Sequence, residues 1–298
     1  MLPNFLVVGA GRSGTTSLHH YLRQHPEVFL PGVKSPSYFY CHRMSTPENR
    51  VHARVTRDYF IYDTRIYEAL FDDVRGESAI GEVSPAYLAS MQAIEHIAKE
   101  IPAAKIVIIL RNPVERLYAR YVARRRDGLE LLKSVEALIE QELEQPLVRD
   151  EAVGTYLSAG FCSHFIEAYL ECFPREQLHL TFFEDLEANA GEYMRDLFAF
   201  LGVSPDFEAD VSRRQNVSGG YIRNPITRAI WTKSAMVRLA IRPHIPKALR
   251  DKLFSHITRD VVPQPLDPGT RLELVGIYRP EIEKLQMLTG RDLSHWLQ

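Results

Sequence analysis

A glycine-rich stretch near the N-terminus, GAGRSGTTS at residues 9–17, has the composition of a loop that holds a phosphate or a related anion. Successive backbone N–H groups in such a loop point inward, and the N-terminus of a following helix adds partial positive charge. Hydroxyl side chains close the stretch, and its only cation is Arg12. The sequence therefore predicts an anion-binding loop at residues 9–17.

Two known nucleotide-binding patterns fit this loop in part. The glycines have the spacing of the dinucleotide fingerprint, but that pattern needs an acidic residue about 20 positions further on, and residues 28–37 contain none. Gly9 and Gly14 also have the spacing of the nucleoside triphosphatase loop, in which a lysine occupies the position of Thr15. A phosphotransferase and an NAD-linked oxidoreductase therefore stay open as alternative functions.

A second cation stands at the end of an unbroken apolar run. Residues 105–110 (KIVIIL) are typical of a parallel strand that is buried on both faces, and Arg111 follows directly. Ligands of open α/β sheets bind outside such strand ends. The helix expected next presents one charged face, formed by Arg116, Arg120, Arg124 and Asp127.

The two blocks together resemble the sulfotransferases that use 3'-phosphoadenosine 5'-phosphosulfate (PAPS). The run from Gly9 to Leu18 is similar to their 5'-phosphosulfate loop, in which Lys or Arg stands at the position of Arg12. Residues 106–118 (IVIILRNPVERLY) are similar to their 3'-phosphate segment, a strand followed by Arg-Asp/Asn-Pro. The resemblance implies transfer of a sulfuryl group from PAPS to an acceptor hydroxyl or amine, with 3'-phosphoadenosine 5'-phosphate (PAP) as the product and no metal.

Two further segments extend the resemblance toward residue 222. Residues 81–88 (GEVSPAYL) are similar to a segment of bacterial sulfotransferases, and residues 173–186 are similar to a Phe-Pro-x-x-Gln signature that ends in Glu-Asp-Leu. A later loop closes over the adenosine in this family, and residues 213–223 are the candidate here. The cofactor-binding residues that the resemblance implies are Gly11, Arg12, Ser13, Gly14, Thr15, Thr16, Ser17, Arg111, Arg120, Arg214 and Arg223.

The predicted catalytic residues are Arg12, Lys34 and Glu82, and the chain departs from the family beside two of them. Some members carry Lys-Glu-x-x-Phe-Phe, whose Glu deprotonates the acceptor; here Lys34 is kept but Ser35 replaces the Glu. A serine hydroxyl cannot take a proton near neutral pH without another base beside it. Val83 replaces a catalytic Lys, so Glu82 is the best remaining carboxylate for the base. An ion pair of Glu82 with Arg12 or Lys34 fits the sequence equally well.

A third departure concerns the 3'-phosphate. Family members usually have a serine at the position of Ala119, and Arg120 beside it could substitute as a cation. The departures keep a further alternative open, a PAPS- or PAP-binding protein that has lost catalysis. His19 and His20 are expected to pack or to be solvated rather than to act in catalysis.

The elements that must position these residues alternate along the chain. We expect strands at residues 3–8, 28–30, 79–88 (with a turn), 105–110 and 178–185, and helices at 91–100, 130–147, 162–173 and 193–201. This alternation predicts an α/β fold with three α/β/α layers, a central parallel sheet and a P-loop-like 5'-phosphosulfate-binding loop. We expect a single domain over residues 1–298, with the cofactor site in 1–222 and a basic helical part in 223–298.

Composition sets the remaining expectations. The net charge of −2 gives no global field that favours nucleic acid, and the three cysteines have no spacing for a disulfide framework or a zinc site. No apolar run reaches the roughly 18 residues of a membrane span, and the first strand starts too early for a signal peptide, so a cytoplasmic protein is expected. Residues 223–259 are basic with interleaved apolar positions, and they could contact an anionic membrane or hold an anionic acceptor. The expected acceptor is a small molecule, a carbohydrate or a lipid.

Overall fold

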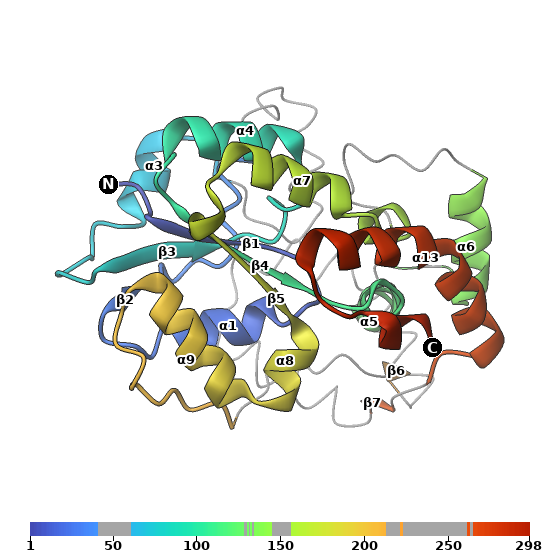
Figure 1. Ribbon diagram of the computed structural model, residues 1–298. Coiled ribbons are helices and arrows are strands. Elements are labelled where there is room, and N and C mark those ends of the chain that lie inside the picture. The colour runs from blue at the N-terminus through green and yellow to red at the C-terminus, as the bar shows by residue number, and fades with distance from the viewer. Residues whose placement is uncertain are drawn as a thin grey trace.

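The computed structural model describes residues 1–40, 61–127, 130, 132, 134–144, 156–212, 221–222, 261–262 and 265–298. At its centre is a five-stranded sheet with the strand order β2-β3-β1-β4-β5, in which all neighbouring strands are parallel (Figure 1). Its strands are β1 (Phe5–Gly9), β2 (Val28–Phe29), β3 (Ala79–Val83), β4 (Lys105–Leu110) and β5 (Leu178–Phe182). The predicted parallel sheet is therefore confirmed.

The side chains of the central strands alternate between two buried faces. In β1, Leu6 and Val8 belong to one core, whereas Phe5 and Val7 belong to the other. The side chains of β4 divide between the two cores in the same way. A strand that is buried on both faces has to be apolar along its length, which explains the unbroken hydrophobicity of β1 and β4.

Helices cover both faces of the sheet, and this confirms the predicted three layers. One face is covered by α3 (Thr64–Ala69), α4 (Met91–Glu100) and α7 (Ser163–Cys172), as Figure 1 shows. The opposite face is covered by α1 (Thr15–Leu22), α8 (Phe183–Ala188) and α9 (Ala190–Leu201). Gly202 ends α9 with a φ of 82°, the left-handed conformation that glycine adopts without strain.

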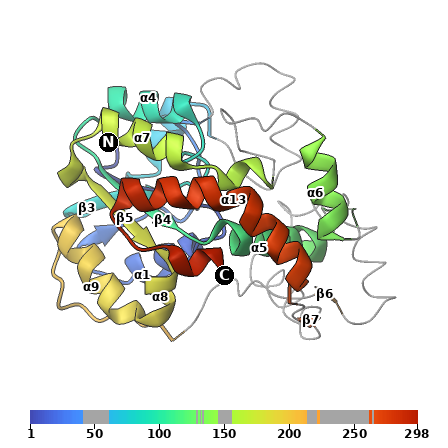
Figure 2. The same ribbon diagram turned by 45° about the vertical axis from the view of Figure 1, so that its right-hand side comes forward.

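The C-terminal helix α13 (Pro268–Thr289) lies beside α5 (Pro113–Asp127) and α7 in both views (Figures 1 and 2). Tyr278 of α13 is fully buried, in the core that also holds side chains of β4. The carboxylate of Glu281 accepts hydrogen bonds at the start of α7, among them one of 2.7 Å from the backbone N–H of Ser163. A side chain of α13 therefore supplies the N-terminal cap of α7.

Several predicted boundaries differ from the structure; the helix predicted at residues 193–201, for example, begins at Ala190. The helix predicted at residues 130–147 begins later, as α6 (Val135–Leu143), because the side chain of Ser134 caps its first turn. The strand predicted at residues 178–185 is shorter, because β5 ends at Phe182. The acidic pair Glu184 and Asp185 lies in the first turn of α8. Carboxylates in a first turn are stabilised by the helix dipole.

Several predictions fall on parts of the chain that lie outside the described residues. These are the roles of Arg214 and Arg223 and the membrane or acceptor contact of residues 223–259. The flanking pairs β6 (Tyr221–Ile222) and β7 (Val261–Val262) form a small antiparallel sheet of their own. Among the helices of the described residues, none combines the length and the apolar character needed to cross a bilayer.

Candidate active site

The glycine-rich loop joins β1 to α1 and is fixed at the carboxyl end of the sheet. Residues 11–14 form its turn, and the backbone N–H of Ala10 donates to the carbonyl of Ile109 in β4 at 2.7 Å. Gly14 is the N-cap of α1, with a φ of 82°. The first turn of α1 has neither a side-chain cap nor an acidic residue. The positive end of the α1 dipole is therefore available to an anion.

Hydroxyl groups line the inner side of this loop. Ser13, Thr15 and Ser17 are buried, and no group in the described part of the chain hydrogen-bonds the Oγ of Ser13. Buried hydroxyls normally have a partner, and an oxygen of a phosphoryl or sulfuryl group is an acceptor of the right kind. Thr16 Oγ1 accepts a hydrogen bond of 2.7 Å from Nζ of Lys34. The structure thus brings Lys34 to the loop.

The loop and the end of β4 meet through two arginines. Nη1 of Arg111 donates a hydrogen bond of 2.9 Å to the backbone carbonyl of Arg12. The guanidinium of Arg111 also lies 4.5 Å from the ring centre of Phe183, a cation–π contact. Burial lowers the pKa of Arg111, although three nearby glutamates act in the opposite direction. The side chain of Arg111 therefore reaches the backbone of the loop, although the two segments lie far apart in the sequence.

The charged face of α5 is buried rather than solvated at its start. Arg116 is 8% exposed, and its buried Nη2 has no hydrogen-bond partner in the described part of the chain. The guanidinium of Arg120 lies 5.4 Å from the ring centre of Tyr156. Burial first, and then the positive charges of Arg116, Arg124 and Arg12 in that order, lower the pKa of Arg120 to about 10. No described carboxylate forms an ion pair with Arg116 or Arg120.

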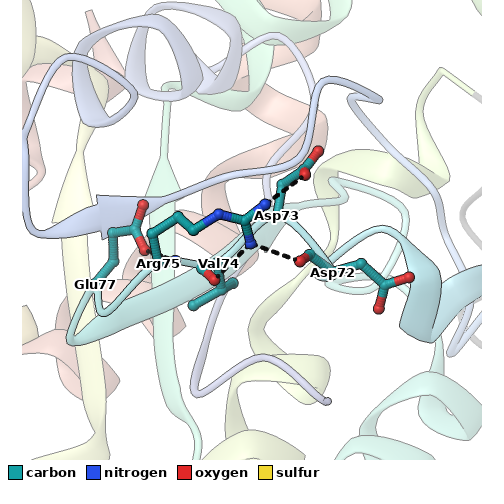
Figure 3. A network of polar contacts seen from close by, with 5 residues as sticks. All are labelled: Asp72, Asp73, Val74, Arg75 and Glu77. Atoms are coloured by element: carbon teal, nitrogen blue, oxygen red, sulfur yellow. Dashed lines mark hydrogen bonds and ion pairs between the residues drawn. The ribbon is translucent and has the colours of Figure 1, made fainter.

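An arginine elsewhere on the surface shows the contrast (Figure 3). Arg75 lies in the turn before β3, where its Nη1 donates to the carbonyls of Asp72 and Val74 at 3.0 and 3.1 Å. Its Nη2 lies 3.3 Å from the carboxylate of Asp73, and both side chains are largely exposed. Arg75 is thus satisfied locally, whereas on α5 the buried Arg116 and the half-buried Arg120 place two positive charges close together, and an anion would balance them.

The segment after β2 approaches the loop in a strained conformation. Ser35 and Ser37 have φ values of 58° and 53°, and Arg12 in the loop has a φ of 71°. Residues other than glycine in this region cost about 1–3 kcal/mol each and cluster at functional sites. The backbone N–H of Ser35 donates to the carbonyl of Val83 at 3.1 Å, which ties the segment to the end of β3.

Glu82 lies beneath this segment in a cage of hydroxyl groups. Its Oε1 accepts from Tyr87 Oη at 2.6 Å and from Tyr67 Oη at 2.9 Å, and its Oε2 accepts from Ser84 Oγ at 2.9 Å. Its partners are these hydroxyls and not Arg12 or Lys34, so the predicted ion pair is not formed. Burial raises the pKa of Glu82 to about 7 against the lowering effect of the three hydrogen bonds.

This geometry bears on the predicted catalytic role of Glu82. The residue is 1% exposed, and a general base has to reach the proton that it removes. The geometry therefore does not support direct contact between Glu82 and an acceptor. Of the three departures from the family pattern, Val83 and Ala119 are buried, and Val83 belongs to the core on the α1 side of the sheet.

Sequence reasoning missed the tyrosines that complete this cage. Ser84 and Tyr87 belong to the Gly-Glu-x-Ser-Pro-x-Tyr segment. Glu82 and Ser84 are two residues apart in an extended segment, and this spacing indicates that their side chains lie on the same face. Tyr67 comes from α3, and no local pattern connects it with Glu82. It had no signal in the sequence.

His19 gives a pH-dependent prediction. Burial, followed by the positive charges of Lys34 and Arg23, lowers its pKa from 6.5 to about 4. The folded protein then binds fewer protons than the unfolded chain between these values, so stability present above pH 6.5 is lost as the pH falls toward 4. Between pH 7.5 and pH 4.5 we expect this effect to lower the free energy of unfolding of the wild-type protein by up to about 3 kcal/mol. His19→Gln should abolish this part of the loss, as measured by urea unfolding at the two pH values.

The control is His20→Gln, which removes an imidazole from the same helix. An unchanged pH dependence in His19→Gln would contradict the burial of a neutral His19 beside Lys34.

Comparisons with known proteins give one matching family model and several similar proteins. The chain matches the sequence model of the Sulfotransferase family over residues 3–208. A solved sulfotransferase from Alicyclobacillus acidocaldarius is 30% identical, with a TM-score of 0.75 and coverage of 100% of both chains. Mouse SULT7A1 complexed with PAP has a TM-score of 0.51 over 94% of this chain and 84% of that chain, but 14% identity, a likeness of fold alone. The human bifunctional heparan sulfate N-deacetylase/N-sulfotransferase 2 is 28% identical over 208 residues, which are 68% of this chain and 22% of that relative.

Proposed function

Because the chain belongs to the sulfotransferase family, we propose that it transfers a sulfuryl group from PAPS to an acceptor hydroxyl or amine. The observation that supports this most directly is the hydrogen bond of 2.9 Å between Arg111 and the carbonyl of Arg12. A nucleotide with anionic groups at both its 5' and 3' positions needs cations and donors from two segments at once. The loop and the end of β4 supply them in one place.

The loop residues fit the 5' end of this nucleotide. The backbone N–H groups at the start of α1 and the hydroxyl of Ser13 would bind its oxygens, since these donors have no protein acceptor among the described side chains. Bound PAPS supplies the sulfur whose bond to the phosphate oxygen breaks as its bond to the acceptor forms. Arg12 and Lys34 would neutralise the negative charge that develops on that oxygen.

The arginines beyond β4 fit the 3'-phosphate. Arg111 would bind it, and Arg120 would take the place of the family's serine at Ala119. The low pKa of Arg120, caused first by burial and then by the neighbouring arginines, indicates a site where a bound anion is favourable. Phosphate oxygens would also reach donors that Arg116 leaves without a partner in the described chain.

The acceptor is proposed from the relatives rather than from the site. The human relative is named for N-sulfation of heparan sulfate, so we propose a carbohydrate or another small molecule that carries a hydroxyl or an amine. In-line transfer requires the protein to align this group with the departing phosphate. The loop and the segment at Lys34 are the two surfaces that would do so.

A comparison of ligands tests the proposed function. We expect PAP at about 100 times its dissociation constant to raise the melting temperature by about 5 °C, because a ligand that binds only the folded state stabilises it. ATP and NAD at the same concentration should give no comparable shift. A larger shift with ATP or NAD would favour a phosphotransferase or an oxidoreductase.

Turnover separates an enzyme from a binding protein. PAP release from PAPS should accelerate with at least one member of a panel of sugar, phenol and amine acceptors. Binding of PAP without any such acceleration would instead support a protein that has lost catalysis.

A further inference from the structure

Two of the hydroxyls around Glu82 also hold the segment that follows β2. Ser84 Oγ donates to Glu82 and accepts a hydrogen bond of 3.1 Å from the backbone N–H of Ser37. Tyr87 Oη donates to Glu82 and accepts a hydrogen bond of 3.3 Å from the backbone N–H of Phe39. A hydroxyl has one proton to donate. Because each of these hydroxyls donates its proton to the carboxylate, the lone pairs of its oxygen are left to accept from the backbone N–H of Ser37 or Phe39.

The third hydroxyl reaches the same segment through its ring. Tyr67 stacks on Tyr38 with 4.2 Å between ring centres and an angle of 8° between their planes. It also makes an edge contact with Phe39 at 5.7 Å. All three donors to Glu82 therefore contact residues 37–39, although they come from α3, from the end of β3 and from the turn after it.

This segment needs such support because its backbone is strained. The positive φ values of Ser35 and Ser37 persist only where surrounding contacts determine them. Lys34 stands directly before them, and its Nζ contacts Thr16 of the loop. The position of Lys34 over the loop therefore depends on contacts that converge on one buried carboxylate.

We propose that Glu82 is a positioning residue, which acts through three hydroxyls to hold residues 37–39 and thereby keeps Lys34, three residues before them, on the phosphate-binding loop. The ionised carboxylate suits this role because it only accepts hydrogen bonds and the three groups around it are all donors. Their hydrogen bonds favour its ionisation against the opposing effect of burial. The groups that face it and can titrate are Tyr67 and Tyr87, whose pKa values burial raises well above 10. The effect on sulfuryl transfer rests on the proposed function, whereas the hold on residues 37–39 does not.

Hydrogen exchange tests the hold on the segment. In Glu82→Gln the amide nitrogen must face either Ser84 or the two tyrosines, and it cannot accept their protons. We therefore expect the backbone N–H of Ser37, of Phe39 or of both to exchange about tenfold faster, as measured by NMR. Ser84→Ala should accelerate Ser37 alone and Tyr87→Phe should accelerate Phe39 alone, while amides of β1 and β4 keep their rates in all three variants.

Nucleotide affinity tests the consequence for Lys34. PAPS carries the sulfuryl group that PAP lacks, so we expect Glu82→Gln to weaken PAPS binding about tenfold more than PAP binding, as measured by calorimetry. In a Lys34→Ala background the same substitution should leave the ratio of the two affinities unchanged, because the group through which it acts is gone.

The outcomes separate the inference from the proposed function. Unchanged exchange of Ser37 and Phe39 in Glu82→Gln would overturn the inference, and so would an equal loss of PAPS and PAP affinity, which is what a purely structural role predicts. If the wild-type protein bound neither nucleotide, the proposed function would fall, and the exchange rates would still decide whether Glu82 holds the segment. If Glu82→Gln does not fold, the exchange rate of the Ser37 N–H in Ser84→Ala tests the same hold on the segment.

Discussion

Replacement of Arg12 by alanine is expected to lower the rate of sulfuryl transfer about 100- to 1,000-fold while the protein stays folded. Arg12 is the only cation of residues 9–17, and its charge reaches Arg120, whose pKa it helps to lower. A preorganised cation at this position stabilises the charge that develops on the departing phosphate oxygen, and alanine removes it. The backbone should not change, because a φ of 71° is no more strained for alanine than for arginine. The backbone carbonyl of residue 12, which accepts from Arg111, is also retained.

The measurement is PAP release with the acceptor that gives the highest rate for the wild-type protein, together with the melting temperature. Arg75→Ala is the matched control, because it removes an exposed arginine whose contacts are local to its turn. Arg12→Lys should retain more activity than Arg12→Ala, since a lysine keeps the charge but not the planar donor geometry. Near-normal turnover of a folded Arg12→Ala variant would refute the assigned role.

The sheet and the meeting of Arg12 with Arg111 could be predicted because their signals are local. The apolar run of β4 spans the same six residues in the sequence and in the structure. Its neighbour Arg111 has to emerge at the carboxyl edge, where the loop after β1 also emerges, once the two strands are parallel. The following Asn112 starts α5 by accepting from the backbone N–H of Val114 at 2.9 Å, so the motif both ends the strand and begins the helix.

The motif around Glu82 shows where sequence reasoning stops. Gly81 looks like part of a functional signature, but its role is steric: an added Cβ would lie 2.3 Å from the ring of Phe5, its neighbour across the sheet. Glu82 was the best carboxylate for a base by elimination. Its burial depends on Tyr67 and on the packing of α3, and neither follows from the spacing of residues in the motif.

The bounds of the C-terminal helix could not be predicted from its pattern for a related reason, although a helical part was expected within residues 223–298. Leu272 and Met287 of α13 are among its exposed residues, while the charged Glu281 is buried because it caps α7. Pro280 also lies inside the helix, where proline is usually disruptive. A polar residue at a core position and apolar residues at the surface weaken the periodic signal on which helix prediction depends.

Replacement of Arg111 by alanine is expected to weaken the binding of PAP about 100-fold but that of adenosine 5'-phosphate only about twofold, because a hydrogen bond to a charged group contributes about 1.5–3 kcal/mol. Arg111 has two roles that have to be separated, since it also supports the carbonyl of Arg12 and stacks on Phe183. Loss of that support should affect both nucleotides, whereas loss of the contact to the 3'-phosphate affects PAP alone.

The ratio of the two affinities therefore isolates the role of Arg111 at the 3'-phosphate, and calorimetry or displacement of a fluorescent nucleotide measures it. Arg111→Lys should give an intermediate ratio, because the lysine keeps the charge but loses the stacking contact and the paired donors. Arg75→Ala serves again as the control that should leave both affinities unchanged. An equal loss for PAP and adenosine 5'-phosphate in Arg111→Ala would mean that Arg111 only holds the loop, and the 3'-phosphate would then have to be bound by Arg120 and its neighbours on α5.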